Sequence, residues 1–320
     1  MPFDTFEELN REIMRLFQEG EYAALYDLLT AHDGRFDDLE NAHFILYLRS
    51  CMAARMDRPD LAVRLIQEAF ERGDWYGERV LRDSPSYASL QGMPDFERLV
   101  ETAKAKQAEL GSGPWTLVAQ PDGGCSTERP CPLVVALHGN NRDGKSALEG
   151  WRAVVNEGWL LAAVQSSQVG GRGRYLWDDQ ATAVRDVAEA FGKLAAQYNI
   201  DESRAVIAGF SLGGETALRV ALTGTVLVRG FILLGPGGPL MSEPEGWQPL
   251  MLGAAARGLR GYILVGEREE AQSIESTRLT VRLLNEAGIA CQLEVIPGIS
   301  HAYPADFGPY LRRAFEFLGV

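Results

Sequence analysis

The sequence AVIAGFSLGG, residues 205–214, gives the strongest indication of the fold. Its first four residues are apolar, as in a buried strand, and a helical pattern follows from Glu215 to Leu222. The motif G-x-S-x-G, centred on Ser211, lies where the strand meets the helix. A turn this sharp strains the serine backbone, and the glycines two residues before and after it remove side chains that would clash. The sequence therefore predicts that Ser211 is raised above a sheet, at a helix N-terminus whose N–H groups favour negative charge.

Short apolar runs alternate with helical patterns on both sides of this turn. The predicted strands are Trp115–Ala119, Leu133–Leu137, Leu160–Val164, Ala205–Gly209, Gly230–Leu234, Gly261–Val265 and Cys291–Ile296. The predicted helices are Ala181–Tyr198, Gly213–Leu222, Ile274–Ala287 and Phe307–Leu318. Most of the runs lack polar alternation, which is typical of strands buried on both faces. The pattern predicts an α/β class with a mostly parallel sheet flanked by helices, which binds ligands beyond the carboxyl ends of its strands.

The first hundred residues differ, because their apolar residues recur at helical spacing. The pattern is clear over residues 6–17 and again over residues 38–73, where it predicts a helical hairpin. This hairpin is similar in size and small-residue placement to a tetratricopeptide repeat. At Gly111-Ser112-Gly113-Pro114 the pattern changes from helical spacing to short apolar runs that alternate with amphipathic stretches. We therefore expect an all-α domain over 1–111 and an α/β domain over 112–320.

Composition and charge exclude several classes of partner. The chain has 320 residues, 46% of them apolar, and a net charge of −13. Such acidity argues against nucleic acid, whose phosphates require clustered Lys and Arg, and against anionic membrane surfaces. No apolar run approaches the roughly 20 residues required to cross a bilayer. The acidic, amphipathic N-terminus does not resemble a secretion signal, so a cytoplasmic protein is the default expectation.

The four cysteines predict neither a disulfide scaffold nor a metal site, because none has metal-ligand spacing with a histidine. Cys125 and Cys131 flank a short loop and could bridge in an oxidising compartment. Without a signal peptide, however, free thiols are the expectation for this pair.

A serine hydroxyl becomes a good nucleophile only with a base within hydrogen-bond reach. Of the four histidines, His32 and His43 lie in the helical region and are expected to be surface or packing residues. His138 ends a strand, and we expect it to anchor the loop that follows. His301 lies between the last strand and the last helix, at the edge of the sheet where ligands bind. Position and elimination therefore make His301 the candidate base.

A carboxylate is needed to orient the imidazole and to stabilise its charged form. Chain order places it between the serine and the histidine. The strand Gly261–Val265 ends in Gly266-Glu267-Arg268-Glu269-Glu270, which offers three candidates. Glu269, three residues past the glycine, is the preferred acid. Glu267 and Glu270 stay open as alternatives, and a solvated acidic turn accounts for the two that are not used.

Acyl transfer also needs N–H donors for the oxyanion that forms on the substrate. One is expected to be the backbone N–H of Leu212, directly after the serine. The other is expected from the loop that follows His138, at Asn140.

Two further residues are expected to bind substrate. Gly139 lies in the same loop as Asn140. Trp177 follows the glycine-rich loop over residues 170–173 and should lie at the same edge of the sheet. Trp177 has an equally good structural interpretation, as a cap for the helix that follows it.

Four motifs in this order carry a family resemblance. They are Leu137-His138-Gly139-Asn140, Gly209-Phe210-Ser211-Leu212-Gly213-Gly214, Val265-Gly266-Glu267-Arg268-Glu269 and Gly298-Ile299-Ser300-His301. Together they resemble α/β-hydrolase fold esterases and their serine peptidase relatives, over about residues 113–320. The resemblance implies a catalytic triad, ester or related acyl substrates and no cofactor. Two features depart from the family: Glu stands where Asp is commoner, and the insertion over 236–260 is too short for a large lid.

These observations predict a carboxylic-ester hydrolase that acts on a small-molecule ester through Ser211, His301 and Glu269. A peptidase or amidase with the same triad is the first alternative, since only the pocket separates the two. A non-catalytic adaptor built on helical repeats is the second, and the complete set of motifs argues against it. The helical domain is expected to cover the active site or, less favoured, to bind a protein partner or a second copy of the chain.

Overall fold

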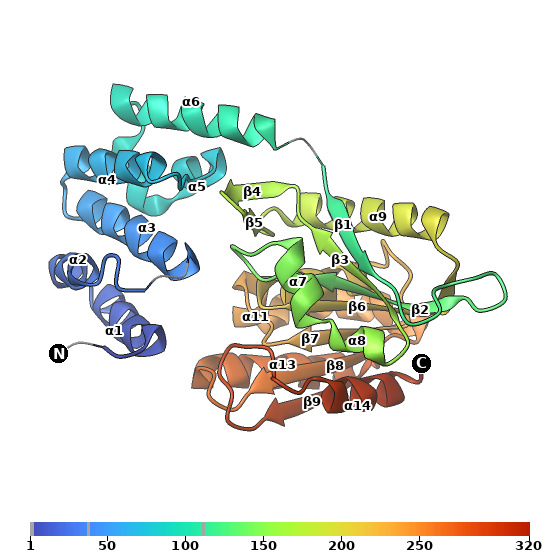
Figure 1. Cartoon of the computed structure of the whole chain (residues 1–320). Helices are drawn as coiled ribbons and strands as arrows, with labels where there is room; N and C mark the ends of the chain where they lie inside the picture. Colours follow the sequence, from blue (N-terminus) through green and yellow to red (C-terminus); the bar gives the residue numbers. More distant parts are fainter. Residues whose placement is uncertain (1–2, 37–38, 111–112) are drawn as a thin grey trace. The chain divides into compact units, whose positions relative to one another are not determined.

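Residues 3–36, 39–110 and 113–320 are described by the computed structural model, in which the chain divides into two units (Figure 1). The first unit comprises Met1–Gly111 together with Val169–Arg172, and the second comprises Ser112–Gln168 and Gly173–Val320. The segment Val169–Arg172 is thus grouped with the helical unit although it lies inside the α/β sequence. The predicted boundary, between residues 111 and 112, lies outside the described residues.

The first unit is helical. Its elements are α1 (Phe6–Gln18), α2 (Tyr22–Ala31), α3 (Leu39–Arg55), α4 (Pro59–Glu71), α5 (Glu78–Asp83), the 3₁₀ helix η1 (Pro85–Leu90) and α6 (Pro94–Glu109). α1 begins at a capping box, in which the Thr5 hydroxyl accepts a hydrogen bond from the Glu8 N–H. α3 and α4 form the hairpin predicted over residues 38–73, of which residue 38 lies outside the described part. One core of apolar side chains runs from α1 to α6.

The second unit is built on a seven-stranded sheet with the order β1-β3-β2-β6-β7-β8-β9. Its strands are β1 (Trp115–Ala119), β2 (Cys131–Leu137), β3 (Leu160–Gln165), β6 (Ile200–Phe210), β7 (Gly230–Leu234), β8 (Arg260–Gly266) and β9 (Ala290–Ile296). β1 is antiparallel to β3, and the other neighbouring pairs are parallel. All seven predicted strands are therefore confirmed, and the carboxyl ends of β3, β2, β6, β7, β8 and β9 share one edge of the sheet.

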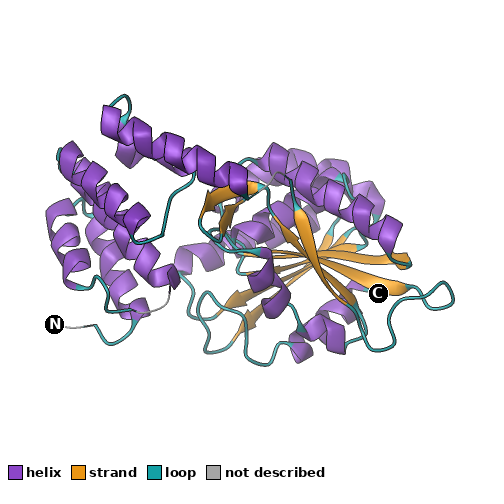
Figure 2. Cartoon of the chain, turned by 45° about the horizontal axis from the view of Figure 1, so that its top comes forward, coloured by secondary structure: helices purple, strands orange, loops and turns teal. Residues whose placement is uncertain are grey.

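Helices cover both faces of this sheet (Figure 2). One face packs against α9 (Gln180–Gln197), α10 (Leu212–Thr223), α12 (Gln248–Ala254) and α13 (Ala271–Glu286), and the other packs against α7 (Gly144–Gly150), α8 (Ala153–Asn156) and α14 (Gly308–Leu318). Further short elements are β4 (Gln168–Gly171), β5 (Arg174–Leu176), α11 (Pro239–Ser242) and the 3₁₀ helices η2 (Pro244–Trp247) and η3 (Ala255–Arg257). The four predicted helices are present, whereas these short elements, α7, α8 and α12 were not predicted.

The expectation of burial on both faces is wrong for the two edge strands. Every residue of β1 is at least partly exposed, and β9 exposes Ala290, Gln292 and Val295. Each has a neighbouring strand on one side only, so its outer side is not covered. The central strands β2, β3 and β7 are buried throughout, because strands flank them on both sides and helices cover both faces.

The expectation of free thiols is also corrected for one pair. Cys125 and Cys131 form a disulfide across the loop that precedes and enters β2. Cys51 and Cys291 are buried and unbridged. Disulfides are characteristic of oxidising compartments, and the cytoplasmic location stays a prediction. Within the described ranges, none of the helices combines the length and the apolar character needed to span a membrane.

Candidate active site

Ser211 occupies the turn between β6 and α10 with a left-handed backbone, φ 55° and ψ −127°. A non-glycine residue in such a conformation costs about 1–3 kcal/mol and persists only where its surroundings enforce it. The flanking glycines are required by space. A Cβ on Gly209 would lie 2.1 Å from the Gly213 carbonyl oxygen, and one on Gly213 would lie 2.2 Å from that of His138. The predicted sharp turn is therefore present, with the serine at the N-terminus of α10.

Backbone hydrogen bonds hold this turn on both sides. The Ser211 N–H donates to the Leu234 carbonyl at the end of β7, over 3.1 Å. The Ser211 carbonyl accepts from the N–H groups of Gly214 at 2.8 Å, Gly237 at 3.1 Å and Glu215 at 3.3 Å. The strained residue is thus tied to the end of the neighbouring strand and to the loop that follows it.

His301 and Glu269 form a side-chain pair at the same edge of the sheet. Nδ1 of His301 lies 3.2 Å from Oε2 of Glu269, and the imidazole is 46% exposed whereas the carboxylate is 8% exposed. The Gly266 N–H donates to the other carboxylate oxygen over 3.4 Å. With Nδ1 directed at the acid, Nε2 is the nitrogen left to accept a proton.

The two alternative acids make other contacts. Oε2 of Glu267 accepts a hydrogen bond from the Gly298 N–H over 2.9 Å. Glu270 precedes α13 as an exposed N-cap residue whose side chain makes no capping bond. Among the three candidates that the sequence offered, Glu269 is the one that the fold brings to His301.

The pair lies beside the nucleophile turn. The ring centroids of His301 and Phe210, the residue before the serine, are 4.6 Å apart. Gly235 follows Leu234, whose carbonyl binds the Ser211 N–H. A Cβ on Gly235 would lie 2.6 Å from Glu269 Oε1 and 3.0 Å from His301 Nδ1. Because Leu234 and Gly235 are adjacent in the chain, Ser211, His301 and Glu269 lie close together where β7 ends.

The loop after β2 lies against the same turn. A Cβ on Gly139 would be 3.5 Å from the Cβ of Ser211. Asn140 follows it, and the Asn140 Oδ1 is buried without a hydrogen-bond partner among the residues that the structure describes. Leu212 is the first residue of α10, and N–H groups in the first turn of a helix have no intrahelical acceptor. Both predicted oxyanion donors therefore belong to segments adjacent to Ser211.

His138 anchors the loop that follows β2, as predicted. It is fully buried, and burial lowers the pKa of its imidazole to about 4. The neutral ring donates from Nδ1 to the Gly139 carbonyl over 2.8 Å and accepts at Nε2 from the Ser166 N–H over 3.3 Å. Trp177 is also fully buried, and its indole N–H donates to the His138 carbonyl over 2.8 Å. In this geometry Trp177 supports the loop and presents no surface to a ligand.

Glu215 was not singled out by the sequence, yet it is buried four residues after Ser211. The available signal was one carboxylate within the otherwise apolar or small first turns of α10 (LGGETALRVALT). Buried carboxylates require hydrogen-bond partners, so an acid at such a position indicates a specific contact.

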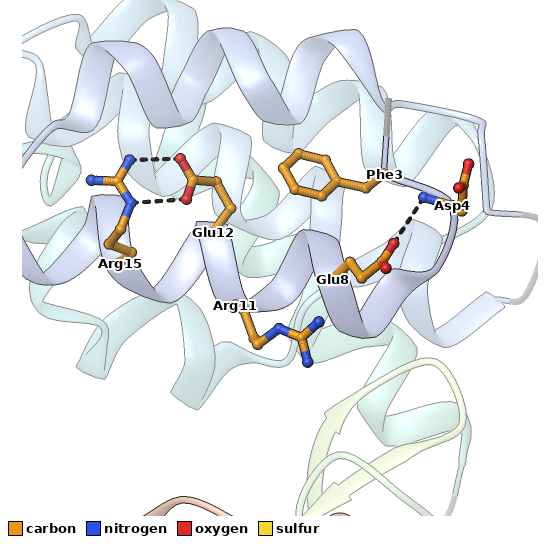
Figure 3. Close-up of a pocket in the computed structure, with 6 residues that line it drawn as sticks. All are labelled: Phe3, Asp4, Glu8, Arg11, Glu12 and Arg15. Atoms are coloured by element: carbon orange, nitrogen blue, oxygen red, sulfur yellow. Dashed lines mark hydrogen bonds and ion pairs between the residues drawn. The ribbon is translucent and has the colours of Figure 1, made fainter. Parts of the chain in front are cut away.

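A separate hollow of about 520 Å³ lies on α1 and the segment before it (Figure 3). It is lined by Phe3, Asp4, Glu8, Arg11, Glu12 and Arg15. The guanidinium of Arg15 is paired with Glu12 within it, and the lining offers no histidine, serine or cysteine. It is therefore not the candidate catalytic site. Among the described residues, no group of three or more His, Cys, Asp and Glu is arranged to hold a metal ion.

Comparison with known proteins supports this reading of the fold. Residues 5–110 match the family described as A/B hydrolase-like, N-terminal domain. An uncharacterized protein from Bacillus cereus is 22% identical, with a TM-score of 0.55 over 98% of each chain. Est1E from Butyrivibrio proteoclasticus, solved with ferulic acid, is 15% identical, with a TM-score of 0.50 over 64% of this chain and 94% of that one.

Two further relatives cover part of the chain. A puromycin-hydrolyzing peptidase from Mycobacterium tuberculosis is 18% identical, with a TM-score of 0.51 over 64% of this chain and 36% of that one. The bifunctional acetylxylan esterase/xylanase XynS20E of Neocallimastix patriciarum is 31% identical over 87 residues, which is 26% of this chain and 12% of that protein. The chain thus matches a small part of that relative's length. The second unit has the α/β-hydrolase fold, and the helical region before it matches a domain that accompanies this fold. The likeness to tetratricopeptide repeats stays a prediction.

Proposed function

We propose that the chain is a serine carboxylesterase in which Ser211 is the nucleophile, His301 the general base and Glu269 the acid that orients it. The observation that carries the proposal is the His301–Glu269 pair, at 3.2 Å, beside the strained turn that presents Ser211. A nucleophile, a base and a group that orients the base, converging at one point, are the requirements for acyl transfer through a covalent intermediate.

In the proposed mechanism the Ser211 hydroxyl attacks the acyl carbon while Nε2 of His301 takes its proton. The imidazolium then gives that proton to the departing alcohol, which leaves Ser211 acylated. A water molecule attacks the acyl-enzyme with His301 again as base, and the acid departs as the serine is restored. Glu269, itself bound by the Gly266 N–H, stabilises the imidazolium in both halves.

Negative charge develops on the substrate carbonyl oxygen in each attack. We assign its stabilisation to the N–H groups of Leu212 and Asn140, with Gly139 close enough to the serine to line the space between them. Fixed backbone donors need no reorganisation as the charge forms, and one such donor contributes on the order of 10²–10³ in rate. No cofactor or metal enters any step of this mechanism.

An ester is favoured over an amide by the curated relative. The 87 residues that are 31% identical belong to a protein named as an acetylxylan esterase/xylanase. The same triad can cleave amides, and the mycobacterial relative of the same fold is named as a peptidase, so the alternative is part of the test.

The test is hydrolysis of p-nitrophenyl esters, from acetate to palmitate, by the wild type, Ser211→Ala and Ser203→Ala. Ser203 lies on the same strand as the nucleophile turn but at its exposed opposite end. We expect Ser211→Ala to lose about four to six orders of magnitude in turnover, and Ser203→Ala to match the wild type. Ser211→Ala activity within tenfold of the wild type would refute the mechanism. Cleavage of aminoacyl or peptidyl amides alone would replace the esterase by a peptidase.

A further inference from the structure

Glu215 is buried, with a relative exposure of 1%, and its carboxylate bonds to a segment distant in sequence. Its Oε2 accepts hydrogen bonds from the N–H groups of Leu240 at 2.9 Å and Met241 at 3.0 Å. Burial raises the pKa of Glu215, whereas the two N–H groups and the guanidinium of Arg219 oppose that rise. Arg219, on the same helix, is the charged group that acts on it.

Glu215 holds residues 235–241, which are the loop after β7 together with the first residues of α11. This loop also touches the proposed catalytic groups. The Gly237 N–H donates to the Ser211 carbonyl over 3.1 Å. Gly235 lies against Glu269 and His301 so closely that a Cβ there would overlap the carboxylate. At Gly238 a Cβ would lie 2.3 Å from Glu215 Oε2 and 2.6 Å from Leu212 Cδ1. The loop therefore packs closely against Glu215 and also against Ser211 and the His301–Glu269 pair.

Glu215 is bonded to the nucleophile turn as well. Its backbone N–H donates to the Ser211 carbonyl over 3.3 Å, so Glu215 and Gly237 share that acceptor. A closed ring of contacts results: the Glu215 side chain holds α11, the loop before α11 holds the Ser211 carbonyl, and that carbonyl binds Glu215. A left-handed serine needs such enforcement, because its conformation is not the one the isolated chain prefers.

We propose that Glu215 is a positioning residue for the reaction, whose carboxylate clamps the loop 235–241 against the Ser211 turn and the His301–Glu269 pair. The inference rests on the proposed function. It assigns Glu215 no contact with substrate. The clamp keeps the serine hydroxyl, the imidazole and the oxyanion donor at Leu212 in the relative positions that the reaction requires.

Two substitutions by residues similar in size to glutamate distinguish the effect of the hydrogen bonds from the effect of the charge. In Glu215→Gln the amide oxygen can accept both N–H groups, so the clamp is retained without the charge. In Glu215→Leu the volume is kept but both N–H groups lose their acceptor. Leu284→Ala is the matched control for lost stability, because Leu284 is fully buried near the end of α13 that is remote from Glu269.

The experiment measures kcat and KM on the preferred p-nitrophenyl ester, and the rate at which a fluorophosphonate labels Ser211, in folded full-length protein. We expect Glu215→Leu to lower kcat and the labelling rate by about 10- to 100-fold with KM within about threefold, since misplacement by about 1 Å has such an effect. Glu215→Gln should stay within about threefold of the wild type, and Leu284→Ala should keep its kcat at a temperature where it is folded.

Unchanged kcat in folded Glu215→Leu would overturn the proposal, as would a loss in Glu215→Gln as large as that in Glu215→Leu. If Glu215→Leu does not fold, Glu215→Met, which is unbranched like Glu, carries the same expectation and the same refutation. Failure of the wild type to be labelled at Ser211 would instead refute the proposed function. The two failures are therefore distinguishable.

Discussion

At the scale of single residues, the chemistry of the site depends on which carboxylate meets His301. Glu267, Glu269 and Glu270 have the same charge, and all three lie between Ser211 and His301 in the chain. Glu269 alone of these is both nearly buried and within 3.2 Å of the imidazole. A shielded carboxylate stabilises an imidazolium more than an exposed one, because solvent screens the exposed charge.

We predict that Glu269→Gln lowers kcat by on the order of 10³–10⁴-fold with little change in KM, because the neutral amide stabilises the imidazolium poorly and favours the wrong tautomer. The matched variant Glu270→Gln should retain wild-type kinetics, since its side chain is exposed and makes no capping bond. Steady-state kinetics on the same ester series compare the two. A full loss in Glu270→Gln with an active Glu269→Gln would move the acid to position 270.

His138 gives a second prediction, on stability. Burial lowers the pKa of this imidazole to about 4, whereas an unfolded histidine has a pKa near about 6.5. The folded state therefore binds fewer protons than the unfolded state between these values, and the stability contribution of neutral His138 is present above about pH 6.5 and lost as pH falls towards 4. At pH 5 the loss is roughly 2 kcal/mol.

Urea unfolding of the wild type and His138→Asn at pH 7 and pH 5 measures this contribution. The wild type should lose more stability between the two pH values than the variant does, by roughly 2 kcal/mol. Equal losses in the two proteins would show that His138 does not carry the predicted proton linkage.

At the scale of elements, the β6–α10 junction works because two glycines let the strand and the helix approach closely. We predict that Gly209→Ala destabilises the fold by about 1–3 kcal/mol, because its Cβ would lie 2.1 Å from the Gly213 carbonyl. The same shift of the turn should slow fluorophosphonate labelling of Ser211 by about 10²-fold.

Gly192→Ala is the matched control for this substitution. Gly192 lies within α9, and a Cβ there would meet nothing within 4 Å. It should stabilise the fold by about 0.5–1 kcal/mol, since alanine is the better helix former, and leave labelling unchanged. Denaturant titrations and labelling rates report both effects. Equal behaviour of the two alanine variants would contradict the argument from close approach.

At the scale of the whole molecule, the helical unit is the part to which the proposed mechanism assigns no role. The short insertion after β7 contains α11, η2, α12 and η3 but no large lid, and residues 5–110 match a domain family that accompanies this fold. We propose, as the favoured of two roles, that the helical unit covers the active site. Binding of a protein partner or of a second copy is the rival role.

We predict that occupancy of Ser211 by a small fluorophosphonate slows amide hydrogen exchange in α1–α6 of the full-length protein, because a cover that contacts the adduct becomes more ordered. Hydrogen exchange before and after labelling measures this, and Ser211→Ala treated with the same reagent is the control. If exchange slows only around α10 and the loop 235–241, the covering role is wrong and the partner-binding role is favoured.

Sequence patterns are enough to predict the features that depend on residues adjacent in the chain. Apolar runs predict the seven strands, and the glycines around Ser211 predict the turn, because strand formation and backbone freedom are local properties. Chain order after the last strand was enough to single out His301. The chain order of the motifs thus predicted the α/β-hydrolase fold and a triad of Ser211, His301 and Glu269, with Glu267 and Glu270 left open as alternatives for the acid.

Contacts between segments that are far apart in the chain follow from the folded arrangement and from no local pattern. Glu269 and His301 are 32 residues apart, and Glu215 and Leu240 are 25 apart. The spacing after Gly266 favours Glu269 but leaves Glu267 and Glu270 open as alternatives. Burial of Trp177, exposure of the edge strands and the grouping of Val169–Arg172 with the helices also depend on what packs alongside. The physical reason is that burial and side-chain pairing are set by neighbours in space, which a pattern along the chain does not specify.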